Sequence, residues 1–249
     1  MNKRFLISVL TVVAFLGTSA ITRVDAAPQG GAPQPRLDVR PNPPDMTGVW
    51  APVGLRDISK VLAPGEEIVL TPYGQERLKT VDQANDPQAR CLPFGPFRAV
   101  LGTIHPSMIV QHPSVVVFLT ESQHTYRLIY TDGRSHPADI EDYPDWYGSS
   151  IGRWEGDTLV VETIGIDNRT WLDGGHEHSI KLRLIERWRM VGPDSLQWTV
   201  TYEDPVFFVK PFTTTLTLHR AIGDRIMSHS CVENEIDSKH LVPTVVGVE

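Results

Sequence analysis

The stretch that decides the fold reads SIKLRLIERWRMV (residues 179–191), GPD (192–194) and SLQWTVTYE (195–203). Polar and apolar residues alternate along both longer segments, which is the two-residue period of a β-strand. The short segment between them consists of residues that favour turns. Two alternating runs joined by a turn predict an antiparallel hairpin.

Similar runs of β-branched and aromatic residues occupy most of the chain from Ser107 onward, separated by turn residues such as those at 155–157 and 223–224. We predict strands near residues 108–111, 114–120, 124–131, 151–155, 158–166, 179–191, 195–203, 213–220 and 225–232. Sequential hairpins form a meander, and closing a meander into a barrel removes the exposed edges of the sheet. The predicted fold is all-β, a lipocalin-like antiparallel barrel, with a strongly bent sandwich as the alternative.

One helix is expected, from Thr71 to about Asn85. Thr71 is a suitable N-cap, Pro72 suits the first helical position, and apolar residues follow at helical spacing. Residues 27–45 are rich in proline and poor in apolar residues. Such a composition cannot bury enough surface to order itself, so we interpret this segment as a linker. A single folded domain is expected at residues 46–243.

The first 26 residues have the three parts of a cleavable signal peptide. Lys3 and Arg4 form a basic start, residues 5–21 carry no charge, and small residues around Ala26 offer a cleavage site. The uncharged run is short for a membrane-spanning helix, and no second long apolar stretch follows. We therefore expect a periplasmic or secreted protein that has no membrane partner once the signal peptide is cleaved.

The charge balance narrows the choice of partner. The chain has 23 basic and 30 acidic residues, a formal net charge of −7. Nucleic acids and anionic membrane surfaces both require basic surfaces, so neither is expected as a partner. The sequence also lacks a phosphate-binding glycine loop, a dinucleotide fingerprint and a Gly-x-Ser-x-Gly elbow. We expect no cofactor, and a small-molecule ligand or substrate as the partner.

Cys91 and Cys231 are the two cysteines of the chain. Disulfides form and persist in exported proteins, so we predict a bridge between them rather than two buried free thiols. Two cysteines so far apart do not have the spacing of a zinc motif.

Several segments resemble known proteins. GVW at 48–50 is similar to the Gly-x-Trp that opens the first strand of lipocalin-type barrels, where the indole plugs one end. YTDGRSHP (130–137) and SIGRWEGDTLVVET (150–163), with TWLD (170–173) and CVEN (231–234), resemble a family of secreted bacterial proteins of uncharacterised activity. The resemblance covers about residues 46–234. It implies a single exported domain and no particular activity.

Glu186 is the first candidate for acid–base chemistry. Alternation along residues 181–191 points it inward with neighbours such as Leu184. Desolvation among apolar neighbours favours the neutral acid, which suits a general acid or base. The alternative is an ion pair with an inward Arg127 or Arg153, since buried carboxylates are usually paired.

The segment WLDGGHEH (171–178) is a predicted loop at the barrel rim, where binding groups collect on a rigid scaffold. We expect a catalytic set made of His136, His178 and Glu186. The residues expected to contact a substrate are Tyr130, Trp146, Trp171, Asp173 and His176. A metal held by the two loop histidines and a carboxylate is the alternative, but such histidines more often form hydrogen bonds, so no metal is expected.

Two hypotheses about function follow. The first is an exported small-molecule enzyme performing cofactor-independent acid–base chemistry (hydration or elimination, isomerisation, or hydrolysis) in a barrel cavity. The second is a periplasmic lipocalin-like protein that binds an apolar ligand without turnover. Convergence of the two imidazoles and Glu186 on one cavity favours the enzyme, whereas scattered positions favour binding or a purely structural role.

Overall fold

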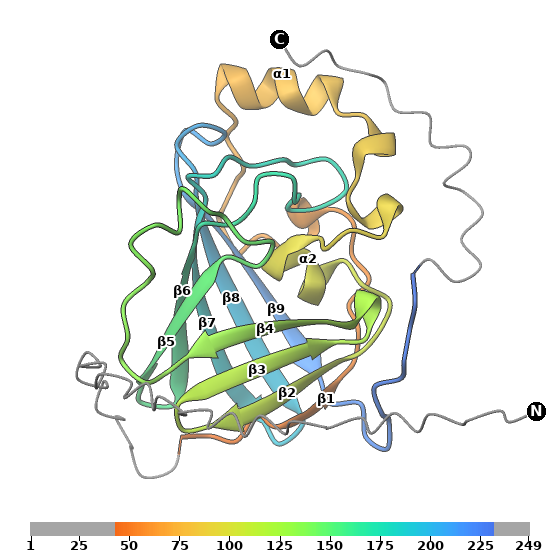
Figure 1. Cartoon of the computed structure of the whole chain (residues 1–249), viewed down its shortest axis with the longest axis vertical. Coiled ribbons are helices and arrows are strands. Elements are labelled where there is room, and N and C mark those ends of the chain that lie inside the picture. Colours follow the sequence, from red (N-terminus) through yellow and green to blue (C-terminus); the bar gives the residue numbers. More distant parts are fainter. Residues whose placement is uncertain (1–42, 232–249) are drawn as a thin grey trace, which may run out of the picture. The chain divides into compact units, whose positions relative to one another are not determined.

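Nine strands and two α-helices make up residues 43–231, the part of the chain that the computed structural model describes (Figure 1). The strands are β1 (Gly48–Trp50), β2 (Ser107–His112), β3 (Val115–Thr120), β4 (Thr125–Tyr130), β5 (Ser149–Glu155), β6 (Thr158–Ile164), β7 (Arg183–Gly192), β8 (Ser195–Glu203) and β9 (Phe212–His219). The helices are α1 (Pro72–Thr80) and α2 (Gly95–Leu101), with 3-10 helices η1 (Ile58–Val61), η2 (Gln83–Asn85), η3 (Gln88–Arg90) and η4 (Ser122–His124).

The chain termini fall outside this description. The predicted signal peptide, most of the predicted linker and the last part of the predicted domain belong to residues 1–42 and 232–249. Within residues 43–231, no helix combines the length and apolar character needed to cross a membrane.

All nine strands form one sheet in sequence order, and the predicted all-β, lipocalin-like barrel with a short helix is confirmed. Seven of the eight neighbouring pairs are antiparallel. The exception is β4 with β5, which run parallel and share two residue pairs, Ile129 with Ser150 and Tyr130 with Ile151. The expected simple meander is therefore wrong at this point, because the connection 131–148 is long enough to return the chain to the end of the sheet at which β4 begins.

A single bridge next to the first and last strands makes the barrel nearly closed. Trp50 pairs with Arg220 across the seam, and the Ala221 backbone N–H donates to the Val49 carbonyl oxygen at 2.9 Å. The Arg220 guanidinium lies 4.6 Å from the centre of the Trp50 indole, which is buried. A Cβ at Gly48 would lie 2.1 Å from Arg220 Nη1. The φ of +143° at Gly48, a backbone angle that side chains rarely adopt, explains why a glycine stands two residues before this tryptophan.

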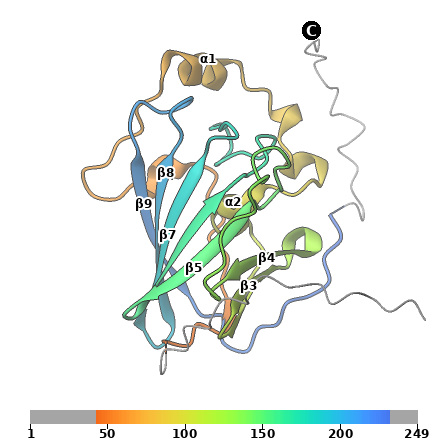
Figure 2. The same cartoon turned by 60° about the vertical axis from the view of Figure 1, so that its left-hand side comes forward.

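The barrel interior is filled by aromatic side chains. Trp188 and Trp198 stack with ring centres 5.0 Å apart, and Phe118 packs on Trp188 at 4.8 Å. Phe97 of α2 contacts Trp198 at 5.2 Å and Tyr202 at 4.9 Å. In both views α2 lies against the strands, whereas α1 lies beyond their ends (Figures 1 and 2). The space that a lipocalin-type barrel offers to a ligand is here occupied by packed rings.

The predicted helix is present but shorter than expected. Thr71 caps it as predicted, because its side chain accepts the Gly74 N–H at 3.1 Å. The helix ends at Thr80, since Val81 has an extended backbone, and the rest of the predicted span includes η2, capped by Asp82. The sequence prediction also missed α2.

The strand predicted at 225–232 is wrong for residues 225–231, which contain no strand. One edge of β9 pairs with β8, and single bridges contact its other side, Leu62 with Thr214 and Trp50 with Arg220 just past the strand. The segment is held instead by single contacts: the Met227 N–H donates to Glu121 Oε2 at 2.8 Å and the His229 N–H to His124 Nε2 at 2.5 Å. The predicted disulfide is confirmed between Cys91 and Cys231.

Candidate functional site

Glu186 lies inside the barrel, completely buried, and is ion-paired with Arg127. The second contact of this pair joins Arg127 Nη1 and Glu186 Oε2 at 3.0 Å, and the Trp198 indole N–H donates to the same oxygen at 3.0 Å. Between the two arginines considered from the sequence, Arg127 is therefore the partner. Arg153 is exposed and pairs with Glu155.

Two hydroxyl groups complete this interior network. Arg127 Nε donates to Ser150 Oγ at 3.0 Å and Nη2 donates to Thr163 Oγ1 at 2.7 Å. Thr163 also donates to Glu186 Oε1 at 3.4 Å. Every charged group is satisfied by protein partners, as a buried ion pair requires.

His178 is buried at the rim. Its Nε2 lies 2.7 Å from Thr170 Oγ1 and its Nδ1 lies 2.9 Å from the Ser179 carbonyl oxygen. Since a carbonyl oxygen only accepts, Nδ1 carries the proton and Nε2 accepts from the threonine. Burial lowers the pKa of His178 and keeps the ring neutral, while nearby carboxylates oppose this.

His136 lies on the connection between β4 and β5. Its Nδ1 is 2.9 Å from Ser149 Oγ, while its Nε2 is buried without a hydrogen-bond partner. Burial lowers the pKa of His136, partly offset by the charge of Glu162. No described hydrogen bond or ion pair joins His136 to His178 or to Glu186.

Two residues predicted to contact a substrate, Tyr130 and Trp146, are each covered by an arginine. The Arg134 guanidinium lies 3.7 Å from the centre of the Tyr130 ring, and that of Arg169 lies 4.1 Å from the centre of the Trp146 ring. Both arginines are also paired with an aspartate two residues before them in the sequence. These aromatic faces are therefore already in contact with side chains of the chain itself.

The structure brings Asp173 and His176 together within the rim loop. Asp173 Oδ2 is 2.8 Å from His176 Nδ1 and accepts the Ile58 N–H at 2.8 Å. Burial raises the pKa of Asp173, but hydrogen bonds from His176 and from backbone N–H groups outweigh it, and the net pKa is lowered. The buried Trp171 pairs across the loop with Glu177.

The rim loop is also fastened to α1. Arg77 donates from Nε to Glu177 Oε2 at 2.7 Å and from Nη2 to Glu177 Oε1 at 2.8 Å. Such a bidentate pair fixes both position and orientation. The loop is thus a rigid part of the barrel end rather than a free connection.

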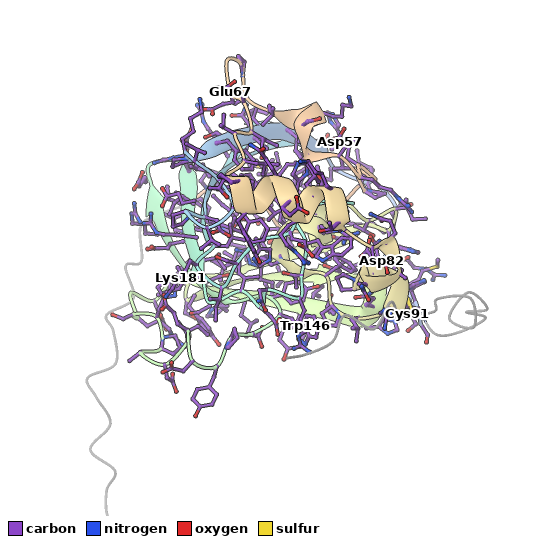
Figure 3. All side chains as sticks on the ribbon, turned by 90° about the horizontal axis from the view of Figure 1, so that it is seen from above. Asp57, Glu67, Asp82, Cys91, Trp146 and Lys181 are labelled. Atoms are coloured by element: carbon purple, nitrogen blue, oxygen red, sulfur yellow. A yellow bond between two sulfur atoms is a disulfide. The ribbon has the colours of Figure 1, made fainter. Side chains whose placement is uncertain are left out.

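A cleft of about 570 Å³ lies beside this loop. Its lining residues are Arg56, Gln83, Ala84, Asp86, Gln88, Ala89, Arg98 and Gly174. Figure 3 looks onto this end of the barrel and labels Asp57 and Asp82, the sequence neighbours of two lining residues. Small-molecule sites typically have volumes of about 300–1,000 Å³, so the cleft is large enough for a ligand.

One wall of the cleft is built on a buried ion pair. Arg98 of α2 donates from Nη1 to Asp86 Oδ1 at 2.7 Å and from Nη2 to Asp86 Oδ2 at 2.9 Å. Asp86 also accepts the Gln88 N–H at 2.8 Å, which holds the turn into η3. The two charges compensate each other.

A second part of the lining is tied to the rim loop through its backbone. The Gly174 N–H donates to the Arg56 carbonyl oxygen at 2.9 Å, and Gln83 Nε2 donates to the Gly174 carbonyl oxygen at 2.6 Å. The side chain of Arg56 is exposed and forms no hydrogen bond or ion pair with any of residues 43–231. The lining therefore carries one uncompensated positive charge.

Neither a known protein family nor a curated protein matches this sequence. The role of the cleft must therefore follow from its own chemistry. Within residues 43–231, no group of three or more histidine, cysteine, aspartate or glutamate side chains is arranged to hold a metal.

None of the residues lining the cleft was predicted from the sequence as a site residue. Two of the predicted site residues, Asp173 and His176, lie on either side of Gly174, the residue of the rim loop that lines the cleft. One signal was available: Arg98 stands in the largely apolar run PFGPFRAVLG (93–102), and an arginine buried in such a run requires a carboxylate partner.

Proposed function

We propose that this protein is an exported small-molecule-binding protein whose ligand occupies the cleft at the barrel rim. The observation that carries the proposal is the guanidinium of Arg56, which has no partner among the described residues and lines a cleft whose other charged groups compensate each other. An uncompensated cation in a concave, mostly prebuilt site supplies a strong interaction for a ligand.

The packed interior supports this location over the barrel cavity. The stacked rings of Trp188 and Trp198 occupy the place where an apolar ligand would lie. The polar lining of the cleft also favours a polar ligand over the apolar one expected from a lipocalin-like barrel.

The contacts of the predicted catalytic groups favour binding over turnover. His136, His178 and Glu186 each have their own hydrogen-bond partners, and none of the three lines the cleft. Acid–base catalysis requires such groups to reach the same substrate.

Export is part of the proposal. The disulfide between Cys91 and Cys231 is typical of oxidising compartments, and the amino-terminal sequence has the parts of a signal peptide. The resemblance of residues 46–234 to secreted bacterial proteins agrees with this interpretation.

Blocking the cleft tests the proposal. Ala89 is exposed and lines the cleft, so Ala89→Trp places an indole there without disturbing the core. Ala138→Trp, at an exposed position outside the lining, is the matched control. Binding is measured by ligand-observed NMR with a panel of polar metabolites and with the apolar probe N-phenyl-1-naphthylamine.

We expect polar compounds to bind the unmodified protein and Ala138→Trp, and to lose binding in Ala89→Trp. The proposal is overturned if no polar compound depends on the cleft, or if the apolar probe is the tighter ligand and is unaffected by Ala89→Trp.

A further inference from the structure

We infer that the cleft recognises a small monocarboxylate that also carries a hydroxyl group, an inference that rests on the proposed binding function of the cleft. It follows from the hydrogen-bonding groups of the lining that the protein itself leaves unused. The orientation of both glutamine amides can be assigned from their partners.

Gln83 must present its oxygen to the cleft. Its amide contacts the Gly174 carbonyl oxygen at 2.6 Å, and a carbonyl oxygen can only accept. The NH₂ group of Gln83 therefore faces Gly174. The remaining atom, Oε1, is an acceptor that no described hydrogen bond uses.

Gln88 must present its NH₂ group. Its amide contacts Arg98 Nη2 at 2.7 Å, and a guanidinium can only donate. The oxygen of Gln88 therefore faces Arg98, and two N–H donors of Nε2 remain. The Asp86–Arg98 pair thus has a positioning role, because it fixes which end of this amide faces a ligand.

Donors dominate the unused groups. Arg56 contributes a planar guanidinium with five N–H donors, and Gln88 adds its NH₂ group, against the single free oxygen of Gln83. A guanidinium matches a carboxylate in a bidentate geometry. A carboxylate satisfies the donors of Arg56 and Gln88, and a hydroxyl on the same molecule can donate to Gln83.

The charge balance favours one negative charge on the ligand. Within residues 43–231, Arg56 is the one lining cation without a carboxylate partner, since Asp86 compensates Arg98. The chain as a whole has a formal charge of −7, which opposes the binding of multiply charged anions. A monocarboxylate therefore fits better than a phosphate dianion.

Isothermal titration with four probes tests the inference. D-gluconate has both groups, D-glucitol has hydroxyls without a carboxylate, hexanoate has a carboxylate without hydroxyls, and inorganic phosphate is the competing anion. We expect gluconate to bind at least about tenfold more tightly than the other three, in line with the strength of charge-assisted hydrogen bonds.

Two variants separate the contributions of the lining. Arg56→Gln is expected to reduce gluconate affinity to that of glucitol, and Gln83→Leu to reduce it to that of hexanoate. Arg153→Gln, which removes an exposed arginine on β5, is the control and should leave gluconate binding unchanged. Because Arg56 is exposed and unpaired, its variant should unfold at the same temperature as the unmodified protein.

The outcomes distinguish this inference from the proposed function. Failure of gluconate to bind, equal binding of glucitol, hexanoate or phosphate, or unchanged binding in Arg56→Gln overturns the inference. If other polar compounds still bind in a manner that Ala89→Trp abolishes, the proposed function stands without it.

Discussion

Removing the positive partner of the interior ion pair should be the most damaging single change in the barrel. Arg127→Met leaves the Glu186 carboxylate buried and without a cation. Breaking a buried ion pair in this way costs about 3–5 kcal/mol in free energy of unfolding. For a domain of this size, that corresponds to a fall in melting temperature of roughly 6–20 °C.

The local contacts explain the magnitude. Glu186 would lose both hydrogen bonds from Arg127 and keep the Trp198 N–H at 3.0 Å and the longer Thr163 contact at 3.4 Å. Water cannot replace the lost donors, because the glutamate has no exposed surface. Ser150 and Thr163 lose less, since their hydroxyls remain 3.0 Å apart.

Urea denaturation followed by tryptophan fluorescence measures the effect, with Arg153→Met as the exposed control expected to cost less than about 0.5 kcal/mol. The double variant Arg127→Met with Glu186→Leu should recover most of the loss, because replacing both members of a buried pair by apolar residues is often nearly neutral. A cost below about 1 kcal/mol for Arg127→Met, or a double variant less stable than the single one, would refute the reasoning.

Three further changes test other parts of the structure. Replacing Cys91 and Cys231 by serine removes a crosslink spanning 140 positions and should lower the free energy of unfolding by up to about 5 kcal/mol, measured against the oxidised protein in urea; equal midpoints would contradict this. Because burial lowers the pKa of His178 in the folded protein, this histidine is protonated in the unfolded chain at a higher pH than in the folded one. The stability that the neutral, buried ring contributes is therefore complete above pH 6.5 and is lost as the pH falls below that value. The pH dependence of unfolding between pH 7 and 5 should therefore be weaker in His178→Gln, and an unchanged slope would count against it. Gly148→Ala should lower the free energy of unfolding by more than about 1 kcal/mol in thermal denaturation, because its Cβ would lie 2.6 Å from a backbone oxygen of β6. Gly156→Ala is the control, since Gly156 has a similar positive φ but no atom within 4 Å of its Cβ position. It reports the cost of the backbone angle alone and should destabilise the protein less.

Local signals were enough to predict most strands. The bounds of β8, Ser195–Glu203, agree with the prediction because a Gly-Pro-Asp turn precedes an uninterrupted alternation of residues. The strand predicted at 225–232 was wrong for residues 225–231 because a strand also needs a partner strand, and pairing across the sheet is a long-range event that the local pattern does not report. The seven-residue helix α2 depends on burial of Phe97 against the barrel, which no local pattern reports.

The interior network could be predicted in part. Alternation along β7 placed Glu186 inside, and its burial required a partner. The choice of Arg127 over Arg153 depends on the barrel, in which side chains of β4 and β7 meet although two strands, β5 and β6, lie between them in the sheet.

The cleft was beyond prediction because its lining comes from four separate parts of the chain, at positions 56, 83–89, 98 and 174. Most of these positions lie in turns and short 3-10 helices, where sequence has no periodicity. These positions come together only in the folded protein, at the end of the barrel beside the rim loop.

The disulfide imposes an order on how the cleft is completed. Cys91 directly follows η3, whose residues Gln88 and Ala89 line the cleft, and its partner Cys231 comes after the last strand. This wall of the cleft can therefore be crosslinked only after the ribosome has released almost the whole domain. Until then, the Asp86–Arg98 ion pair and the Gln88 N–H bond to Asp86 hold this wall without the crosslink. If the cleft binds a ligand as proposed, the covalent bond that fixes one of its walls is therefore the last to form, after Cys231 has been synthesised and oxidised.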